Sequence, residues 1–363
     1  MHCEWCYLRF REVISPARDV AFRVLLRVHG GAYASDLLRR ACAKLDTRDA
    51  ALAETIVLGC LRRQSQLDFL ISHYSGRPQP KLDEEVRIAL RMGIYQIRYL
   101  DRIPMRAAVA ESVELVKRGL KRSATGFVNA VLRKVNREPL KWPDQATALS
   151  VPSWMLERWQ QQYGPEAAEK IATTALEEPA VYLNPDTGRQ QDIGSQSIVP
   201  LLDLEPGMTL LDLCAAPGNK TAQALALGAR VVACDRYPRR LAEVPAAAER
   251  VALDATEALP FSRKFERILI DAPCAGTGTL ARNPEIKWRL QPSDLAAFQT
   301  RQKKMIEQAL EHLSTDGKLV YSTCSLECEE NENAVAGFNV LETRMRLPGR
   351  DAGDGFFAAV ITL

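Results

Sequence analysis

The sequence predicts a protein of two domains, one all-helical and one α/β with a doubly wound sheet. Its 363 residues are enough for two hydrophobic cores. Up to about residue 138 the apolar residues recur at helical spacing, whereas from Gly207 onward short apolar runs alternate with helical segments. The proline-containing run EPLKWP, residues 138–143, separates the two patterns and marks a boundary near residue 140.

About five helices are predicted in the first domain, over residues 15–140, behind a tail of residues 1–14. Ser15 and Pro16 form a helix start, and Gly30 with Gly31 forms a stop. Almost nothing in this region is typical of a strand. The other periodic runs extend from Asp46 to Gly76, from Leu82 to Ile97, from Ala107 to Leu120 and from Phe127 to Val135.

The charges are distributed unevenly along the chain. Residues 1–145 hold 26 Lys and Arg against 16 Asp and Glu, and residues 146–363 hold 22 against 29. A basic domain joined to an acidic one favours a polyanionic partner such as nucleic acid, because lysine and arginine neutralise phosphates. A basic surface that is simply solvated explains the same numbers, so charge alone does not decide between the two.

No apolar stretch is long enough to span a bilayer, and the first ten residues do not resemble a secretory signal. We therefore expect a cytoplasmic protein with no membrane partner. In a reducing compartment, nine cysteines are free thiols more often than disulfide partners. Cys3 and Cys6 resemble half of a zinc site, but no second pair follows at suitable spacing, so no metal is expected.

Residues 141–195 are predicted to connect the two domains. Two tryptophans of this region, Trp154 and Trp159 on the helix from Ser153, are assigned to a core rather than to a base-stacking surface. The predicted elements are a helix from Ser153, a helix from Pro165 to about Pro179, and a short strand over AVYLNP.

The α/β domain is predicted over residues 196–363. Strands are expected at TLLDLC, RVVACD, RVALD, RILIDAPC, KLVYSTCS and FFAAVITL, and helices at TAQALALG, at PRRLAEVPAAAE and from Ser293 to Leu313. The alternation is typical of a parallel sheet covered by helices, and the last strand is also compatible with antiparallel pairing. Ligands of such sheets bind at the carboxyl ends of the strands.

A cofactor loop is predicted where LLDLCAAPGNKT runs from a strand into a helix, bringing backbone N–H groups close to a ligand. The loop lacks the glycine spacing of a dinucleotide site and the lysine spacing of a P-loop. Asp212, Asp235 and Asp254 lie at three successive strand ends, where carboxylates can accept hydrogen bonds from a ribose and an adenine. Any one of them could instead cap a helix, but the three together favour S-adenosylmethionine.

Two cysteines are predicted at neighbouring strand ends. Cys274 follows Asp271 at the end of the fourth strand, and Cys324 ends the fifth. A thiolate that adds to C6 of a cytosine makes C5 nucleophilic enough to accept a methyl group. Asp271 could bind N3 and N4 of the base, and the other thiol could assist product release. A single cysteine here would more often be an inert buried residue.

Two resemblances point to the same activity. The segments RDVAFRVLLRV, TRDAALAETIVLGCLRRQSQLDFLI and GFVNAVLRKVNRE resemble the NusB-like RNA-binding domain, although an unrelated helical bundle would show similar periodicity. The segments LDLCAAPGNKT, DAPCAGTGTLARNPEIKW, YSTCS and DGFFAAVI resemble the RNA cytosine-5 methyltransferase family, whose catalytic domain is Rossmann-like. The resemblance implies methyl transfer from S-adenosylmethionine to C5 of a cytosine in RNA, most simply 16S ribosomal RNA, by a monomer.

The family pattern also implies a role for each matching residue. The nucleophile is Cys324, and Cys274 is the thiol that helps product release. Pro-Cys cysteines are the nucleophiles of DNA cytosine-5 methyltransferases, which makes Cys274 the rival, but Thr-Cys-Ser favours Cys324. Asp271 binds the base and lies at the cofactor. The implied cofactor residues are Cys214, Ala215, Ala216, Pro217, Gly218, Asn219 and Lys220 in the loop, then Asp235 on the ribose side and Asp254 on the adenine side.

The chain departs from the family pattern in three places, one of which is the short helix after Asp235. The family has a larger RNA-contacting subdomain before the cofactor loop, where this chain has only AVYLNPDTGRQQDIGSQ, and Asn219 replaces a glycine. These departures leave two alternatives open. One is a non-catalytic NusB-like RNA-binding assembly factor, which is disfavoured because Asp235, Asp271 and both cysteines are present. The other is a transfer-RNA cytosine-5 methyltransferase.

Overall fold

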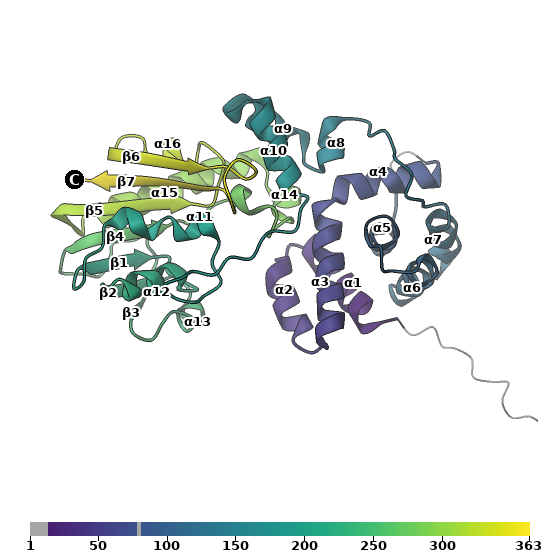
Figure 1. Ribbon diagram of the computed structural model, residues 1–363, viewed down its shortest axis with the longest axis horizontal. Coiled ribbons are helices and arrows are strands. Elements are labelled where there is room, and N and C mark those ends of the chain that lie inside the picture. Colours follow the sequence, from purple (N-terminus) through teal and green to yellow (C-terminus); the bar gives the residue numbers. More distant parts are fainter. Residues whose placement is uncertain (1–13, 78–80) are drawn as a thin grey trace, which may run out of the picture. The chain divides into compact units, whose positions relative to one another are not determined.

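The computed structural model describes residues 14–77 and 81–363. The chain divides into two compact units. The first extends to Ser153 and includes Asn283–Glu285, and the second contains Trp154–Arg282 and Ile286–Leu363. Figure 1 shows helices alone in the first unit and a sheet flanked by helices in the second, so the predicted combination of a helical and an α/β domain is confirmed.

The first unit is built around helix α5, which the surrounding helices enclose (Figure 1). Ten residues of α5 are buried, among them Gln96, whose side chain accepts a hydrogen bond from Arg18 Nε at 2.6 Å. Arg18 also forms an ion pair of 2.8 Å with Glu111. Its described residues form the α-helices α1 Pro16–His29, α2 Ala34–Cys42, α3 Thr47–Arg62, α4 Gln64–Ser75, α5 Glu84–Tyr99, α6 Met105–Arg118, α7 Thr125–Leu132 and α8 Gln145–Leu149.

Two details of the helical prediction were wrong. The run from Asp46 to Gly76 is not one helix, because Arg63 leaves helical geometry between α3 and α4, with φ −109° and ψ 22°. Its guanidinium lies 4.6 Å from the centroid of the Tyr99 ring. Helix α2 was not predicted, because its nine residues form only about two and a half turns and bury only three apolar side chains.

The second unit begins with helices α9 Ser153–Tyr163 and α10 Pro165–Thr174, followed by a seven-stranded sheet. Trp159 of α9 is fully buried, as predicted, and its indole N–H donates to Glu327 Oε1 at 3.1 Å. The order of the strands is β3-β2-β1-β4-β5-β7-β6. Their bounds are β1 Thr209–Leu213, β2 Arg230–Asp235, β3 Glu249–Ala252, β4 Phe265–Asp271, β5 Leu313–Thr323, β6 Asn339–Arg346 and β7 Phe356–Thr362.

Successive residues of the central strands point to opposite faces of the sheet. Leu211 packs in the core on one face and Leu210 in the core on the other. Helix α15, Leu295–Leu310, covers the first face, and helix α12, Asn219–Ala226, covers the second. Strands β3, β2, β1, β4 and β5 are parallel, and β7 is antiparallel to β5, which confirms the alternative considered for the last strand.

Several predicted bounds in this unit were wrong. AVYLNP contributes only an isolated bridge between Leu183 and Gln190, and β6 was not predicted because its side chains are mostly exposed and show no apolar run. The helix expected at PRRLAEVPAAAE is limited to α13, Pro238–Leu241, because Pro245 follows too closely for a longer helix. The remaining short elements are α11 Ile193–Gln196, α14 Ile286–Arg289 and α16 Glu332–Val335.

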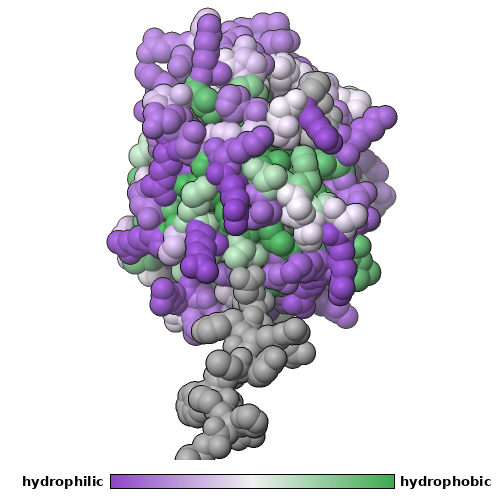
Figure 2. Space-filling view, turned by 90° about the vertical axis from the view of Figure 1, so that its right-hand side faces the viewer, coloured by the Kyte–Doolittle hydropathy of each residue, from purple (hydrophilic) through white to green (hydrophobic). Residues whose placement is uncertain are grey.

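Hydrophilic side chains dominate the face shown in Figure 2, with apolar residues scattered between them. Among the described residues, no helix combines the length and the apolar character needed to cross a bilayer. Cys3 and Cys6, which resemble half of a zinc site, lie outside the described residues.

Leu120 ends helix α6 in a left-handed conformation, with φ +60° and 86% of the side chain exposed. The N–H of Lys121 donates to the carbonyl of Val116 at 3.0 Å, which is the hydrogen bond of a Schellman cap. Glycine is the usual residue at this position, because a β-carbon is strained there. Little packing offsets the strain, since the side chain projects into solvent.

We expect Leu120→Gly to raise the free energy of unfolding of the first unit by about 0.5–1 kcal/mol, because it removes the β-carbon from a left-handed position. Urea or thermal unfolding measures the change. Leu120→Ala is the control, since it shortens the side chain but keeps the β-carbon and should not stabilise the protein. Equal stabilisation by both substitutions would contradict the explanation.

Candidate active site

The loop after β1 turns the chain from the sheet into helix α12. Cys214 and Gly218 have φ values of +65° and +93°, and the Ala216–Pro217 peptide bond is cis. A β-carbon at Gly218 would lie 2.8 Å from Cα of Val244 and 2.7 Å from Cδ of Pro245, so only glycine fits. The loop therefore passes close to the segment that follows β2.

Neighbouring residues hold the same loop through its carbonyl and amide groups. The N–H of Ala215 donates to the carbonyl of Cys234 at 2.7 Å. Arg240 donates to the carbonyl of Ala216 at 2.9 Å. Two contacts join the loop to residues 189–190: Arg189 donates to the carbonyl of Pro217, and Asn219 Nδ2 donates to the carbonyl of Gln190, both at 3.3 Å.

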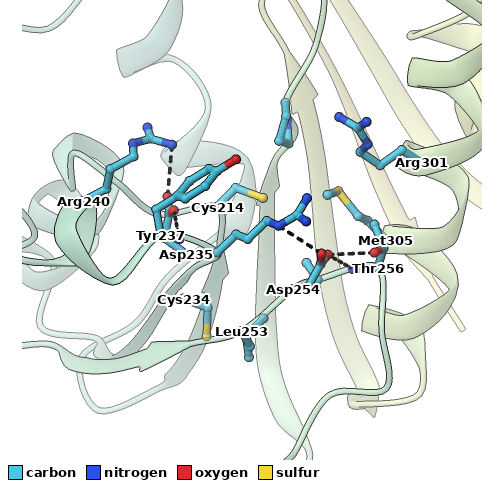
Figure 3. Close-up of a pocket in the computed structure, with 13 residues that line it drawn as sticks. Cys214, Cys234, Asp235, Tyr237, Arg240, Leu253, Asp254, Thr256, Arg301 and Met305 are labelled. Atoms are coloured by element: carbon cyan, nitrogen blue, oxygen red, sulfur yellow. Dashed lines mark hydrogen bonds and ion pairs between the residues drawn. The ribbon is translucent and has the colours of Figure 1, made fainter.

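A cavity of about 180 Å³ opens beside this loop at the carboxyl ends of the strands. Figure 3 shows Tyr237 and Arg240 on one side of the cavity and Arg301 and Met305 on the other. The residues that line it are Cys214, Cys234, Asp235, Arg236, Tyr237, Arg240, Leu253, Asp254, Ala255, Thr256, Pro273, Arg301 and Met305.

Two carboxylates face this cavity. Asp235, 4% exposed, accepts a hydrogen bond from the N–H of Tyr237 at 2.9 Å. Asp254 accepts hydrogen bonds from the N–H and hydroxyl of Thr256, and these hydrogen bonds lower the pKa of the Asp254 carboxyl. Each carboxylate also has an arginine beside it, Arg240 for Asp235 and Arg236 for Asp254, both at 3.4 Å.

The predicted cofactor residues do not all reach the cavity. Cys214, Asp235 and Asp254 line it, whereas Asp271 and the residues from Ala215 to Lys220 do not. Asp254 does not end a strand as predicted, because β3 stops at Ala252 and Asp254 lies in the turn that follows.

The third strand-end aspartate, Asp212, is fully buried behind the loop. Its Oδ2 accepts a hydrogen bond from the hydroxyl of Thr221 at 2.5 Å, and its Oδ1 has no partner among the described residues. Burial raises the pKa of the Asp212 carboxyl from 3.8 to about 7. Asp212 is therefore a buried acceptor with one oxygen available to a donor.

Cys274 and Cys324 lie in contact. Asp271 of β4 pairs with Ser322 of β5 in parallel register, and each cysteine follows the end of its strand. The two sulfur atoms are 3.4 Å apart, and both residues are partly buried. The hydrogen bond with the Cys324 sulfur and burial raise the pKa of the Cys274 thiol well above its usual value. The raised pKa favours the protonated form of Cys274, and the geometry of the contact allows either sulfur to be the donor.

Asp271 is held from two sides. Its Oδ2 accepts a hydrogen bond from Lys220 Nζ at 2.6 Å, and its Oδ1 accepts one from the hydroxyl of Ser322 at 2.9 Å. Lys220 is almost fully buried, and its amine lies 5.4 Å from the centroid of the Phe356 ring. The side chain of Lys220 therefore orients Asp271.

Sequence reasoning missed several residues of this region. Arg236 and Tyr237 directly follow Asp235, so their proximity to a strand end was the available signal. Arg301 and Met305 are four residues apart on α15 and line the cavity. The sequence indicated only that they belong to a helix. Within the described residues, no three His, Cys, Asp or Glu side chains are grouped so as to hold a metal ion.

Two family models match the chain. The model described as 16S rRNA methyltransferase RsmB/F matches residues 199–347, and the NusB family model matches residues 15–137. Ribosomal RNA small subunit methyltransferase B from Escherichia coli, in strains K12 and HS, is 31% identical to this chain over 408 residues. The match covers 92% of this chain and 95% of the relative. Because the alignment is longer than this chain, the relatives carry insertions that it lacks.

Two solved structures share the fold. The structure titled PH0851 has a TM-score of 0.77 at 20% identity and covers 97% of this chain and 99% of its own. A methyltransferase homolog from Pyrococcus horikoshii has a TM-score of 0.52 at 24% identity and covers 61% of this chain and all of its own. At these identities the likeness concerns the fold.

The raised pKa of Asp212 predicts a pH dependence of stability. Because the native carboxyl holds its proton up to about pH 7, its stabilising contribution is present below pH 4 and is lost as pH rises through 7. Asparagine has no proton to lose. We expect Asp212→Asn to gain stability relative to the parent protein between pH 4 and pH 8, by about 1.4 kcal/mol for each unit of the pKa shift.

Urea unfolding of both proteins across this pH range measures the difference. The exposed Asp316 provides the control, since Asp316→Asn should leave the pH dependence of the parent protein unchanged. Parallel stability curves for Asp212→Asn and the parent protein would contradict the assignment.

Proposed function

We propose, because this chain belongs to the 16S rRNA methyltransferase RsmB/F family, that it methylates C5 of a cytosine in 16S ribosomal RNA. The protein is an S-adenosylmethionine-dependent RNA methyltransferase with a NusB-like helical domain. What we propose beyond this is the cytosine base, the C5 position and the covalent mechanism. The observation that carries them is the contact between the Cys274 and Cys324 sulfur atoms beside Asp271, after neighbouring strands.

The proposed nucleophile is Cys324. Its thiolate forms a bond to C6 of the cytosine, which moves an electron pair to C5. The protonated Cys274 thiol, 3.4 Å away, stabilises the negative sulfur before it attacks. The cofactor, when bound, supplies a methyl group on a positively charged sulfur. After methylation the C5 proton leaves and the bond between C6 and the Cys324 sulfur breaks, which restores the aromatic ring and the thiolate.

Cys274 is proposed to serve this release step. The hydrogen bond with Cys324 is the largest cause of its raised pKa. When Cys324 is bound to C6, that sulfur is no longer a free acceptor, and the pKa of Cys274 falls. The Cys274 thiol can then release its own proton to solvent, and the resulting thiolate can receive the C5 proton.

Asp271 is proposed to bind the base at N3 and N4. The addition of sulfur to C6 places negative charge on the ring, and protonation at N3 relieves that charge. Lys220 and Ser322 hold the Asp271 carboxylate in one orientation, at 2.6 and 2.9 Å. We therefore assign the side chain of Lys220 to the orientation of Asp271.

The residues beside the cavity fit S-adenosylmethionine by the chemistry of their polar atoms. A ribose diol, an adenine amino group and an ammonium group are all donors, and this site offers acceptors. Asp235 is proposed for the ribose and Asp254 for the adenine. The unpartnered, buried Oδ1 of Asp212 suits a further donor. The loop from Cys214 to Lys220 is proposed to hold the amino-acid end of the cofactor through its backbone.

The basic helical domain is proposed to bind the RNA. Residues 1–145 carry ten more positive than negative side chains, which suits a polyanion. We propose residues 15–140 as the RNA-binding domain, 141–195 as the connecting region and 196–363 as the catalytic domain. The target base leaves its stack to reach the two thiols, at a cost of a few kcal/mol that a loop cytosine would lessen.

The proposed roles of the two cysteines predict different effects of replacing each one by alanine. Cys324→Ala should abolish both methylation and the covalent adduct, because the nucleophile is absent. Cys274→Ala should accumulate the protein–RNA adduct, because release is slowed. Denaturing gel electrophoresis after incubation with labelled RNA and S-adenosylmethionine measures the adduct. An adduct with Cys324→Ala would reverse the two roles.

Bisulfite sequencing identifies the target. RNA from cells with and without this gene should differ at one cytosine or a few in 16S ribosomal RNA, where C5 methylation protects the base from deamination. A difference confined to transfer RNA would replace the proposed substrate with the alternative one. The absence of any difference would favour the non-catalytic assembly factor.

A further inference from the structure

Glu330 and Asn331 lie a few residues beyond Cys324, and neither has a role in the proposed reaction. Both are fully buried. Helix α16 follows them, so the chain has left the sheet and folds back against the ends of β4 and β5. A buried carboxylate so close to two thiols requires a physical explanation.

The Glu330 carboxylate links the segments that carry the two cysteines. Its Oε1 accepts a hydrogen bond of 2.8 Å from the N–H of Ala275, the residue after Cys274. Its Oε2 accepts one from the hydroxyl of Ser325, the residue after Cys324. One side chain therefore spans the two strand ends.

Further hydrogen bonds fix Glu330 in place. Gln302 of α15 donates to its Oε1 at 3.2 Å and to the carbonyl of Pro273 at 3.1 Å. The hydroxyl of Tyr321, in β5, donates to the carbonyl of Glu330 at 2.6 Å. The position of the carboxylate is thus determined by α15 and β5 together.

Asn331 holds the Cys324 side in the same way. Its Oδ1 accepts a hydrogen bond from the hydroxyl of Thr323 at 2.6 Å, and its Nδ2 donates to the carbonyl of Ser325 at 3.0 Å. The residues before and after Cys324 are therefore both tied to Asn331. Of Glu330 and Asn331, only Glu330 also bonds to the segment that carries Cys274.

We propose that Glu330 is a positioning residue that keeps the Cys274 and Cys324 sulfur atoms in contact. The inference rests on the proposed function, in which one sulfur acts at C6 and the other serves C5, the adjacent ring atom. Two thiols at the ends of separate strands need a bridge to hold them at one distance. The carboxylate supplies it, because it accepts from both flanking residues.

A role in stability alone explains Glu330 poorly. Burial raises the pKa of the Glu330 carboxyl to about 7, so placing this acid here is unfavourable for folding at neutral pH. An apolar side chain of similar size would avoid that cost, as replacements of buried charged groups often show. The three hydrogen bonds to the Glu330 carboxylate instead favour a residue kept for the geometry that it imposes.

The test measures sulfur–sulfur proximity directly in the full-length protein without RNA. Diamide, which removes two hydrogens from a pair of thiols, converts Cys274 and Cys324 into a disulfide. Mass spectrometry of the linked peptides follows the rate of this reaction and separates it from reactions of the other cysteines. We expect Glu330→Ala to slow it by about tenfold, the effect of losing hydrogen bonds to a charged acceptor.

Two variants serve as comparisons. Glu330→Gln keeps an oxygen for the N–H of Ala275 and an amide that Ser325 can contact, so it should restore most of the rate. Glu332→Gln changes an exposed acid two residues away and should react at the rate of the parent protein. A methylation assay should show a lower kcat for Glu330→Ala with an unchanged KM for RNA, since the change affects the thiols and not RNA binding.

The outcomes separate this proposal from the proposed function. A folded Glu330→Ala that forms the disulfide as fast as the parent protein would overturn the positioning role. If Glu330→Ala does not fold, the decision passes to Ser325→Ala, which removes only the hydroxyl that reaches Oε2 and should also slow the disulfide. An unchanged rate of disulfide formation in Ser325→Ala would likewise overturn the positioning role of Glu330. If Glu330→Ala slows the disulfide but the parent protein methylates no RNA, the positioning role is supported and the enzymatic function is rejected.

Discussion

The parallel pairing of β4 with β5 is the constraint on which the site depends. Parallel strands end at the same edge of a sheet, so the register of Asp271 with Ser322 brings the residues that follow each strand together. Cys274 and Cys324 are 50 positions apart in sequence, yet their sulfur atoms touch. A shift of register by one residue would also turn these side chains to the other face.

Around this pairing the polar groups are arranged in two different ways. The carboxylates beside the cavity, Asp235 and Asp254, keep acceptor atoms near space that a ligand can fill. Asp271 and Glu330 have both carboxylate oxygens bonded within the protein, which makes them rigid. The site therefore combines carboxylates that line a cavity with carboxylates whose orientation is fixed by hydrogen bonds to both oxygens. Such preorganisation lowers the cost of forming charge during a reaction.

The sequence was sufficient for the fold class and for the strands that end near the site. RVVACD and RILIDAPC are short apolar runs with an acid at the carboxyl end, so their position at the sheet edge follows from the α/β pattern. Contacts between distant segments were not accessible. The separation of the two sulfur atoms depends on register, and the bond from Lys220 to Asp271 depends on a side chain that turns away from its own loop.

Other errors have local causes. A continuous helical pattern hid the break at Arg63, because periodicity continues on both sides of it. The sequence shows several acidic residues and asparagines after Cys324, but nothing in their order distinguishes the buried Glu330 from the exposed Glu332. Burial of a charged side chain is decided by the donors around it, and the donors to the Glu330 carboxylate come from three separate segments.

The place of β7 in the sheet has a consequence for biosynthesis. Strand β7 lies between β5 and β6, although it is the last of the seven to leave the ribosome. Until residues 356–362 emerge, β5 presents an unpaired edge to the cell, and such edges invite association with other chains. The catalytic half of the protein therefore matures late in translation, when the helical half has already had time to fold.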